Sequence, residues 1–486
     1  MAQSNVARPG GRRREGRASR GQGREGRASR GRVGGLGAMV SALAGAFAGA
    51  LSCAPAGEGG ARRAAPPVAA ASAVPTAPMR APIVSTRWGE QYRELTARAT
   101  EAYQRRDWAA FVEASEQALA AFPGHPVFLY NLACAYGVSG RAEDAARLLD
   151  ELTTRHVFFD GKAENDFAPV RENPAFARAA ARLEAVARET RPGGEIAFAL
   201  PERDLLVEGV AHDPASGSFF VGSVHRRKIV RLEVGKAPRD FVAEGLLGVF
   251  GLDVDVTRGL LWACTGALPA MTGYRDADRG RAEALAFDLR TGVLARRVVV
   301  ATEGKHVCND LAVLGEGELL VSDSLAGEVL RVVPGVDEPR PFLPAGVLVS
   351  PQAIAVSREA LFVADYSLGL VRVDRASGEV ALVAAPAEAV LTGIDGLRIV
   401  SGGLVAIQNG VTPHRVVALT LAPGGRRVER ARVLAQADPR WAEPTLGTVV
   451  GGALYYVANS QWPAFGRDAN PAPETLAAPI LLKLAL

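Results

Sequence analysis

The C-terminal part of the chain, from about Gly194 to Leu486, repeats one short pattern. A polar residue, a small residue, an aliphatic residue and then Ala or Asp are followed, about ten residues later, by an apolar stretch of strand-like sequence. The pattern begins at Glu208, Phe250, Asn309, Gln352, Asp395 and, in degenerate form, near Thr445. The spacings are about 42, 59, 43, 43 and 50 residues, which suit propeller blades if the second holds a loop insertion between Gly266 and Arg281. Six copies predict a six-bladed β-propeller.

A propeller needs its ring to be closed. After Gly194 the apolar residues alternate with a period of 2, whereas before it they recur at helical spacing. We expect the first strand-like segment, 195–200, to pair with the last one, 480–484, because this pairing removes the exposed sheet edges.

The segment from Trp88 to about Arg191 is predicted to be helical. Two stretches superimpose at a period of about 34 residues, so the segment resembles a short tetratricopeptide array. In the clearer repeat, helices over 130–136 and 145–152 are separated at Gly140. Helices within 166–190 are expected to cap the stack. Such an array either binds a protein partner or packs as an adaptor against the propeller.

The chain of 486 residues is long enough for several domains, and its apolar fraction of 48% can bury them. The predicted fold class is multidomain, α followed by all-β. We assign 1–53 to an Arg-rich lead and signal segment, 54–85 to a linker rich in Pro and Ala, 86–192 to the helical domain and 193–486 to the propeller.

The positive charge of the chain is concentrated at its start. Residues 1–53 contain ten Arg and two Glu, so the formal net charge of +4 for the chain leaves the remainder mildly acidic. A nucleic-acid-binding protein needs basic surface on its folded part, so no nucleic-acid partner is expected.

A segment rich in Ala and Gly, 33–52, ends at Leu51-Ser52-Cys53-Ala54 and has the character of a secretion signal. Its end resembles the lipobox of bacterial lipoproteins, with Ala50 where Leu is usual, which implies lipidation of Cys53. An ordinary signal peptide or a short membrane anchor are the alternatives. In each case we expect export to the bacterial cell envelope, with lipid anchoring placing the chain on the periplasmic side of a membrane.

The other three cysteines, Cys134, Cys264 and Cys308, are scattered and show no CxxC spacing. Neither a disulfide framework nor a zinc site is predicted from this pattern. We expect all three to be buried thiols.

The repeated pattern also predicts a functional site. The innermost strand of each blade lines the central channel, so the first residues of the six patterns should form a ring at one mouth of it. Glu208, Asn309, Gln352 and Asp395 would present carboxylate or amide oxygens there, which are the ligands of a hard divalent cation. No His or Cys joins this ring, which argues against a site that prefers zinc.

The same segments resemble the blade motifs of the senescence-marker-protein/gluconolactonase family: Leu206-Val-Glu-Gly-Val-Ala211, Val307-Cys-Asn-Asp-Leu-Ala312, Pro351-Gln-Ala-Ile-Ala355 and Ile394-Asp-Gly-Leu397. This resemblance implies a six-bladed propeller with one divalent cation in the channel, Ca²⁺ first and Mg²⁺, Mn²⁺ or Zn²⁺ as alternatives. Carried over by position, it makes Glu208, Gln352 and Asp395 direct ligands, with Asn309 completing the site directly or through water.

The resemblance further implies hydrolysis of a lactone or ester at the channel mouth, with Asp395 as ligand or proton acceptor. His306 is a second candidate acid or base, although a lone loop His is more often solvated. Two departures weaken the enzymatic hypothesis: Gln352 stands where the family has Asn, and Val307 stands where active members often carry a substrate-binding Arg.

An alternative is a non-catalytic binding lipoprotein, in which the propeller and the helical repeats present surfaces to an unknown ligand or protein partner. Polar residues at strand starts also commonly satisfy turn backbone, so each ring residue has a structural interpretation. A second recurring set follows the second strands and is interpreted mostly as turn and inter-blade hydrogen bonding: Asp323-Ser324, Asp365-Tyr366, Gln408-Asn409 and Asn459-Ser460. Packing is likewise the favoured role for Trp262 and Trp462.

Overall fold

The computed structural model describes residues 79–465 and 471–486, which form a helical segment followed by a six-bladed β-propeller. The predicted fold class is therefore confirmed. The signal segment and Cys53 lie outside the described residues. None of the helices in the described ranges is both long and apolar enough to cross a membrane.

In the described part of the chain, five α-helices precede the propeller, and each packs against the next one in sequence. They are α2 (Trp88–Gln104), α3 (Trp108–Ala121), α4 (Pro126–Val138), α5 (Ala142–Thr154) and α6 (Pro174–Val186). The shared core is made of small and aromatic side chains around Leu129, Leu149 and Phe176. Helix α4 ends just before Gly140, whose φ of 74° favours glycine. The resemblance to tetratricopeptide repeats stays a prediction.

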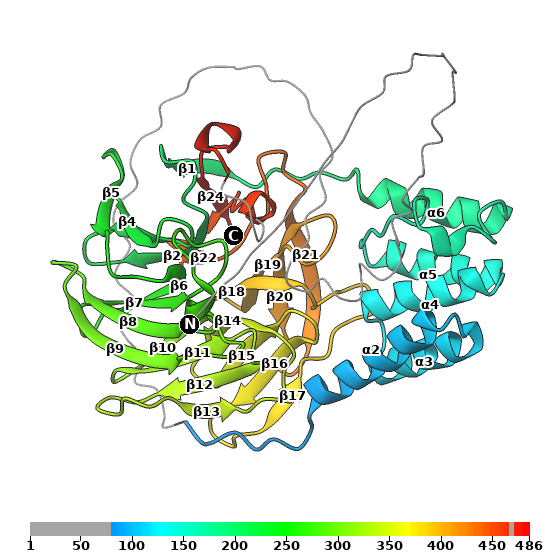
Figure 1. The fold of residues 1–486 in the computed structure, drawn as a ribbon, viewed down its shortest axis with the longest axis horizontal. Helices are drawn as coiled ribbons and strands as arrows, with labels where there is room; N and C mark the ends of the chain where they lie inside the picture. Colours follow the sequence, from blue (N-terminus) through cyan, green and yellow to red (C-terminus); the bar gives the residue numbers. More distant parts are fainter. Residues whose placement is uncertain (1–78, 466–470) are drawn as a thin grey trace, which may run out of the picture. The chain divides into compact units, whose positions relative to one another are not determined.

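The propeller consists of six antiparallel four-stranded sheets. Figure 1 shows the innermost strands gathered around the centre, with the outermost strands at the periphery. The innermost strands are β2 (Val207–Asp213), β6 (Gly248–Asp255), β10 (Cys308–Gly315), β14 (Pro351–Val356), β18 (Ile394–Val400) and β22 (Gly447–Val450). Each contacts the innermost strands of its neighbours, and β2 contacts β22, so the ring is complete.

The remaining strands follow in chain order in the first five blades, whereas the outermost strand of the sixth blade is β1. The second strands are β3 (Ser218–Ser223), β7 (Leu260–Gly266), β11 (Glu318–Asp323), β15 (Ala360–Asp365), β19 (Gly403–Gln408) and β23 (Ala453–Val457). The third are β4 (Lys228–Leu232), β8 (Ala282–Asp288), β12 (Glu328–Val332), β16 (Gly369–Asp374), β20 (Arg415–Leu421) and β24 (Ile480–Ala485). The outermost are β5 (Arg239–Val242), β9 (Leu294–Ala301), β13 (Arg340–Leu343), β17 (Val380–Leu382), β21 (Val428–Gln436) and β1 (Glu195–Ala199).

The two ends of the propeller sequence close the ring as predicted. The outermost strand β1 pairs antiparallel with β24, with Glu195 opposite Lys483 and Ala199 opposite Ile480. The insertion expected in the second blade is also present, because β7 ends at Gly266 and β8 begins at Ala282.

The small residue in each repeated pattern has a packing reason. A Cβ on Gly209 would lie 2.3 Å from the carbonyl oxygen of Phe250, and one on Gly396 would lie 2.8 Å from that of Thr445. Because glycine has no Cβ, the backbone of the next blade can approach closely at each of these positions, and the residue that approaches is the ring residue of that blade.

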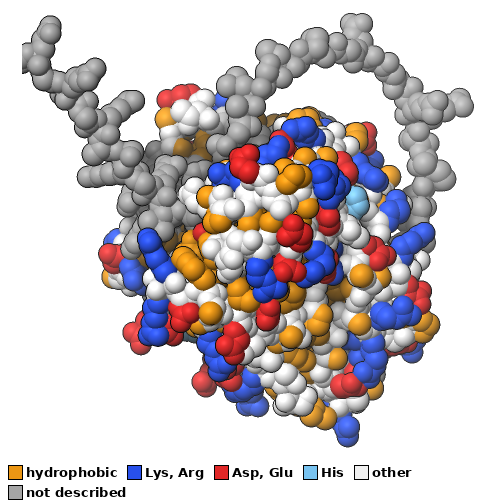
Figure 2. All heavy atoms as spheres, turned by 90° about the vertical axis from the view of Figure 1, so that its right-hand side faces the viewer, with side chains coloured by type: hydrophobic (Ala, Val, Ile, Leu, Met, Phe, Trp, Pro, Cys, Tyr) orange, Lys and Arg blue, Asp and Glu red, His pale blue; other side chains and the backbone are white. Residues whose placement is uncertain are grey.

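The helical segment is hydrogen bonded to loops of the fourth and fifth blades. His125 Nε2 lies 2.7 Å from the carbonyl oxygen of Ser367, and the backbone N–H of Phe158 donates to the carbonyl of Thr412. Both loops join a second strand to a third strand, so they lie on the propeller face where the innermost strands begin. The face in Figure 2 carries acidic and basic side chains interspersed, rather than one block of either sign.

Candidate functional site

The ring residues lie at local irregularities of the innermost strands. The pairing register shifts between Val207 and Val210, between Cys308 and Asp310, between Pro351 and Ile354, and between Ile394 and Gly396. A β-bulge of this kind redirects the side chain at the bulge, which is why bulges recur beside functional sites. Glu208, Asn309, Gln352 and Asp395 each fall within one of these shifts, and each is at most 9% exposed.

Two of the predicted ligands are carboxylates that affect each other. Burial raises the pKa of Asp395 to about 7, and a hydrogen bond from Asn409 Nδ2, 2.7 Å away, partly opposes this rise. Burial raises the pKa of Glu208 well above its usual range, and the charge of Asp395 raises it further. Trp462 Nε1 donates to Glu208 Oε2 at 3.0 Å. Asp395 and Glu208 thus form one electrostatic unit.

The two amide residues of the ring are hydrogen bonded to each other. Asn309 Nδ2 donates to Gln352 Oε1 at 2.8 Å, and Gln352 Nε2 donates to Ser350 Oγ at 2.9 Å. The structure therefore brings the amides of the third and fourth blades together.

The sixth blade contributes a carboxylate that the repeated pattern did not predict. Thr445 is fully buried, and its hydroxyl donates to the backbone carbonyl of Glu208 at 2.8 Å, so it offers no ligand oxygen to the channel. Glu443, two residues earlier, supplies the acidic group instead. Burial raises the pKa of Glu443 to about 7, with the charge of Asp395 adding to the effect. Its Oε2 is buried and has no hydrogen-bond partner.

Loops supply three further side chains that the sequence analysis had not assigned to the site. Asn409 holds Asp395, and Tyr366 donates from its hydroxyl to Asn409 Oδ1 at 3.0 Å. Burial and the charges of Asp395, Glu443 and Glu208 raise the pKa of Tyr366 well above its usual range. Trp462, which was expected to serve packing, is hydrogen bonded to Glu208 and stacks on Phe250 with ring centroids 6.3 Å apart.

Asn409 and Tyr366 belong to the second recurring set, whereas its Asp and Gln members and Asn459 form turn and loop hydrogen bonds as predicted. Asp365, for example, accepts backbone hydrogen bonds from Val349, Ser350, Ser367 and Leu368. The exception at Asn409 arises because its side chain turns toward the channel mouth rather than into its own turn.

His306 lies in a different cluster. Its Nδ1 is 2.6 Å from Asp323 Oδ2, and Asp323 Oδ1 accepts the backbone N–H groups of Val307 and Ala326. Among described His, Cys, Asp and Glu residues, one trio offers ligand atoms within 4.8 Å of one another, and it consists of His306, Asp323 and Glu328. Asp323 thus accepts three hydrogen bonds, and the role of His306 as a second acid or base stays a prediction.

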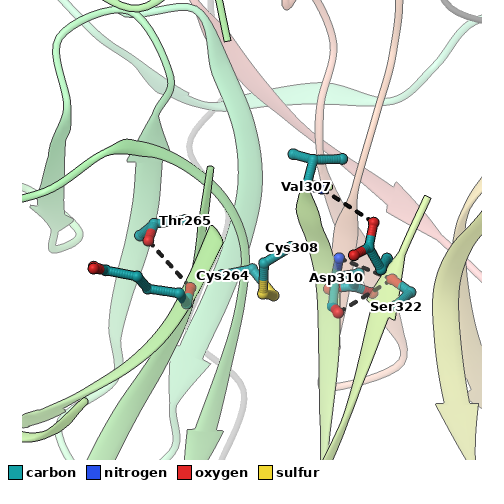
Figure 3. Close-up of a disulfide and its surroundings, with 8 residues drawn as sticks. Cys264, Thr265, Val307, Cys308, Asp310 and Ser322 are labelled. Carbon is teal, nitrogen blue, oxygen red and sulfur yellow. Dashed lines mark hydrogen bonds between the residues drawn. A yellow bond between two sulfur atoms is a disulfide. The ribbon is translucent and has the colours of Figure 1, made fainter. Parts of the chain in front are cut away.

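The expectation that all three isolated cysteines are thiols is wrong for two of them. Cys264 on β7 and Cys308 on β10 form a disulfide that joins the second and third blades, as Figure 3 shows. Adjacent blades bring the two residues together although 44 positions separate them in sequence. The bond anchors β10 next to Asn309. Cys134 is a free, buried thiol as expected.

A second set of charged residues, Asp253, Asp310 and Arg398, lies on the innermost strands next to the ring residues; we call it the second layer. Asp310 follows Asn309 and is fully buried; burial raises its pKa to about 6, and the charge of Arg398 opposes this rise. Arg398 Nη1 lies 3.5 Å from Asp310 Oδ2. The pKa of Asp253 is likewise raised by burial, and it accepts the backbone N–H of Val313. Arg398 therefore compensates the second layer rather than the ring carboxylates.

Two surface clefts lie away from these residues. One, of about 330 Å³, is lined by the loop 158–163 and by Ala180 and Glu184, and the other, of about 240 Å³, lies beside Leu205 and Val230. In the first, Lys162 and Glu184 form an ion pair. Neither cleft gathers unpaired catalytic groups, so the channel mouth is the better candidate site.

Neither a family model nor a curated protein matches this chain. Solved structures that resemble it include a gluconolactonase from Xanthomonas campestris, with 15% identity, a TM-score of 0.41 and coverage of 61% of this chain and 93% of that one. A luciferin-regenerating enzyme has 11% identity and a TM-score of 0.42, and the match covers 61% of this chain and 96% of that one. The calcium-binding protein regucalcin from Agrobacterium tumefaciens has 15% identity, a TM-score of 0.40 and coverage of 60% and 94%. At these values the likeness bears on none of the site residues.

Proposed function

We propose that this chain binds one divalent cation, Ca²⁺ in the first place, at the channel mouth and hydrolyses a lactone or related ester there. The observation that carries the proposal is the group formed by the buried carboxyl groups of Glu208 and Asp395 and the half-buried carboxyl group of Glu443, whose pKa values are all raised. Burying several negative charges together is costly unless a cation compensates them.

The donor set fits such a cation. The ligand oxygens are the carboxylates of Glu208 on the first blade and Asp395 on the fifth, and the amides of Asn309 on the third and Gln352 on the fourth; Ca²⁺ prefers oxygens of this kind. The carboxylate of Glu443, on the sixth blade, adds a further negative charge beside this set.

When bound, a divalent cation would polarise a substrate carbonyl and lower the pKa of water. The side chains of the protein would orient the reacting groups and accept the proton. Asn409 fixes the orientation of Asp395 through its 2.7 Å hydrogen bond, and Tyr366 fixes Asn409. Held in this orientation, Asp395 would accept a proton from the attacking water. Phe250 and Trp462 form an apolar wall that excludes water from one side of the site.

We also propose that the chain is exported and anchored through a lipid on Cys53. The disulfide between Cys264 and Cys308 supports export, because structural disulfides persist in oxidising compartments such as the bacterial periplasm.

A second candidate function is non-catalytic binding, in which the propeller and the helices present partner surfaces. The hydrogen bond from Asn309 to Gln352 favours it, because the amide oxygen of Gln352 is then already used within the protein. Under this hypothesis the raised pKa values indicate protonated carboxyl groups rather than a cation site.

Metal content and hydrolysis distinguish the two functions. The full chain, Asp395→Asn and the control Glu359→Gln, an exposed residue in the turn before β15, would be purified with Ca²⁺ and analysed for bound metal. We expect about one ion per chain, a melting temperature lowered by EDTA and hydrolysis of at least one lactone in a panel, with all three properties lost only in Asp395→Asn. If no ion binds and Asp395→Asn melts like the unmodified protein with and without EDTA, the cation site and the hydrolase are both refuted.

A further inference from the structure

The channel mouth carries negative charge without a basic partner. Among the described residues, Glu208, Asp395 and Glu443 form no ion pair with Lys or Arg. Their polar neighbours include Trp462, Asn409, Thr445 and one another. Arg398, the nearby basic residue, is paired with Asp310 in the second layer. Val307, two residues before Asn309, is buried and apolar and adds no charge there.

One divalent cation balances two of the three carboxylates, which leaves one negative charge. We assign the remaining negative charge to Glu443. Glu208 already accepts a hydrogen bond from Trp462, and Asp395 accepts one from Asn409. Its backbone is in the left-handed region, with φ of 71°, and its carbonyl accepts from the backbone N–H and the hydroxyl of Ser460. The protein thus holds a strained residue in place with an unpartnered Oε2.

The surroundings of this carboxylate are aromatic. Tyr366 is close enough for the charges of Glu443 and Asp395 to act on its hydroxyl, and Trp462 stacks on Phe250 at an interplanar angle of 19°. Aromatic faces attract cations through their quadrupole and present no donor for an anion. A carboxylate with a buried, unpartnered oxygen beside aromatic rings is complementary to an ammonium group.

We propose that Glu443 is a specificity-determining residue and that the site takes a lactone or ester bearing a protonated amine or quaternary ammonium group, while it rejects substrates that carry a carboxylate. This inference rests on the proposed function for the reacting bond, but the charge preference is a property of binding. It can therefore be measured without any turnover.

Three lactams that share one five-membered ring and resist hydrolysis serve as probes: protonated 3-amino-2-pyrrolidinone, neutral 2-pyrrolidinone and anionic pyroglutamate. Their dissociation constants would be measured by ligand-observed NMR titration of the full chain with Ca²⁺ at pH 7. Glu443→Gln removes the charge and keeps the shape, Glu443→Asp keeps the charge, and Glu359→Gln removes one charge from an exposed turn.

We expect the cationic lactam to bind about tenfold or more tightly than the neutral one, with the anionic lactam weakest, because a close buried charge pair contributes at least about 1.4 kcal/mol. This order should disappear in Glu443→Gln and persist in Glu443→Asp and Glu359→Gln. Equal affinities for the three probes, or an order unchanged in Glu443→Gln, would overturn the inference. Failure of the hydrolase hypothesis would instead appear as absent turnover with the charge preference intact.

Discussion

The raised pKa of Glu443 has a consequence for stability that can be measured without a substrate. Burial raises this pKa from 4.5 to about 7, so the folded chain binds the proton more tightly than the unfolded chain does. In metal-free protein, the stabilisation is fully present below about pH 4.5 and is lost as pH rises through 7. The difference between the two pKa values corresponds to about 3 kcal/mol of unfolding free energy.

Replacing Glu443 with Gln removes the titrating group and keeps its shape. The variant and the unmodified protein should be similarly stable near pH 4.5, whereas above pH 7 the variant should be more stable by up to about 3 kcal/mol. The measurement is guanidinium unfolding in EDTA, followed by tryptophan fluorescence and circular dichroism between pH 4.5 and 8, with Glu359→Gln as the charge control.

Adding Ca²⁺ should make the unmodified protein more stable than Glu443→Gln above pH 7. A ligand that binds only the folded state stabilises it by mass action, and the protein with all three carboxylates should gain more than the variant. Parallel pH profiles for the two proteins in EDTA would refute the argument, because they would mean that the carboxyl group of Glu443 is not buried in the folded protein in solution.

Three further predictions concern the scaffold. Replacing Cys264 and Cys308 with Ser should lower the free energy of unfolding by about 4 kcal/mol, the value of the chain-entropy model for a separation of 44 residues. A reductant should lower the melting temperature of the unmodified protein but not that of the double variant. Equal melting temperatures of the two proteins without reductant would contradict this prediction. Gly251→Ala should destabilise by about 1–3 kcal/mol, because its Cβ would lie 2.3 Å from Asp310 Oδ1; a melting temperature like that of the parent protein would exclude this contact. Burial lowers the pKa of His125 to about 4, so the stabilisation that neutral His125 contributes is present above about pH 6.5 and is lost as pH falls toward 4. Hydrogen exchange of the loop 366–369 should therefore become faster in acid, and His125→Phe should abolish this acid sensitivity. The same pH dependence of exchange in the variant would refute the prediction.

The repeated pattern in the sequence predicted most of the propeller, because blade geometry is local. Alternation with a period of 2, a small residue where blades meet and turn residues between strands are all readable within some 40 residues. These signals placed Glu208, Asn309, Gln352 and Asp395 on the innermost strands, where the structure has them.

What the sequence did not predict depends on contacts between blades or on loop conformation. Glu443 lies in an irregular segment beside the degenerate sixth pattern, and it enters the site through a left-handed backbone that no periodicity reveals. Trp462 reaches Glu208 from a connection between β23 and β24. The disulfide links strands of different blades, so the spacing of Cys264 and Cys308 carries no motif.

The pairing of β1 with β24 sets an order of events during synthesis. The helices and β1 leave the ribosome first, but β1 must wait for the last strand of the chain before its backbone groups find their partners. Such a long-range pairing is slow to form, and until then the chain exposes unpaired strand edges. A chain released without its final residues would therefore have no partner for β1 and no means of completing the ring.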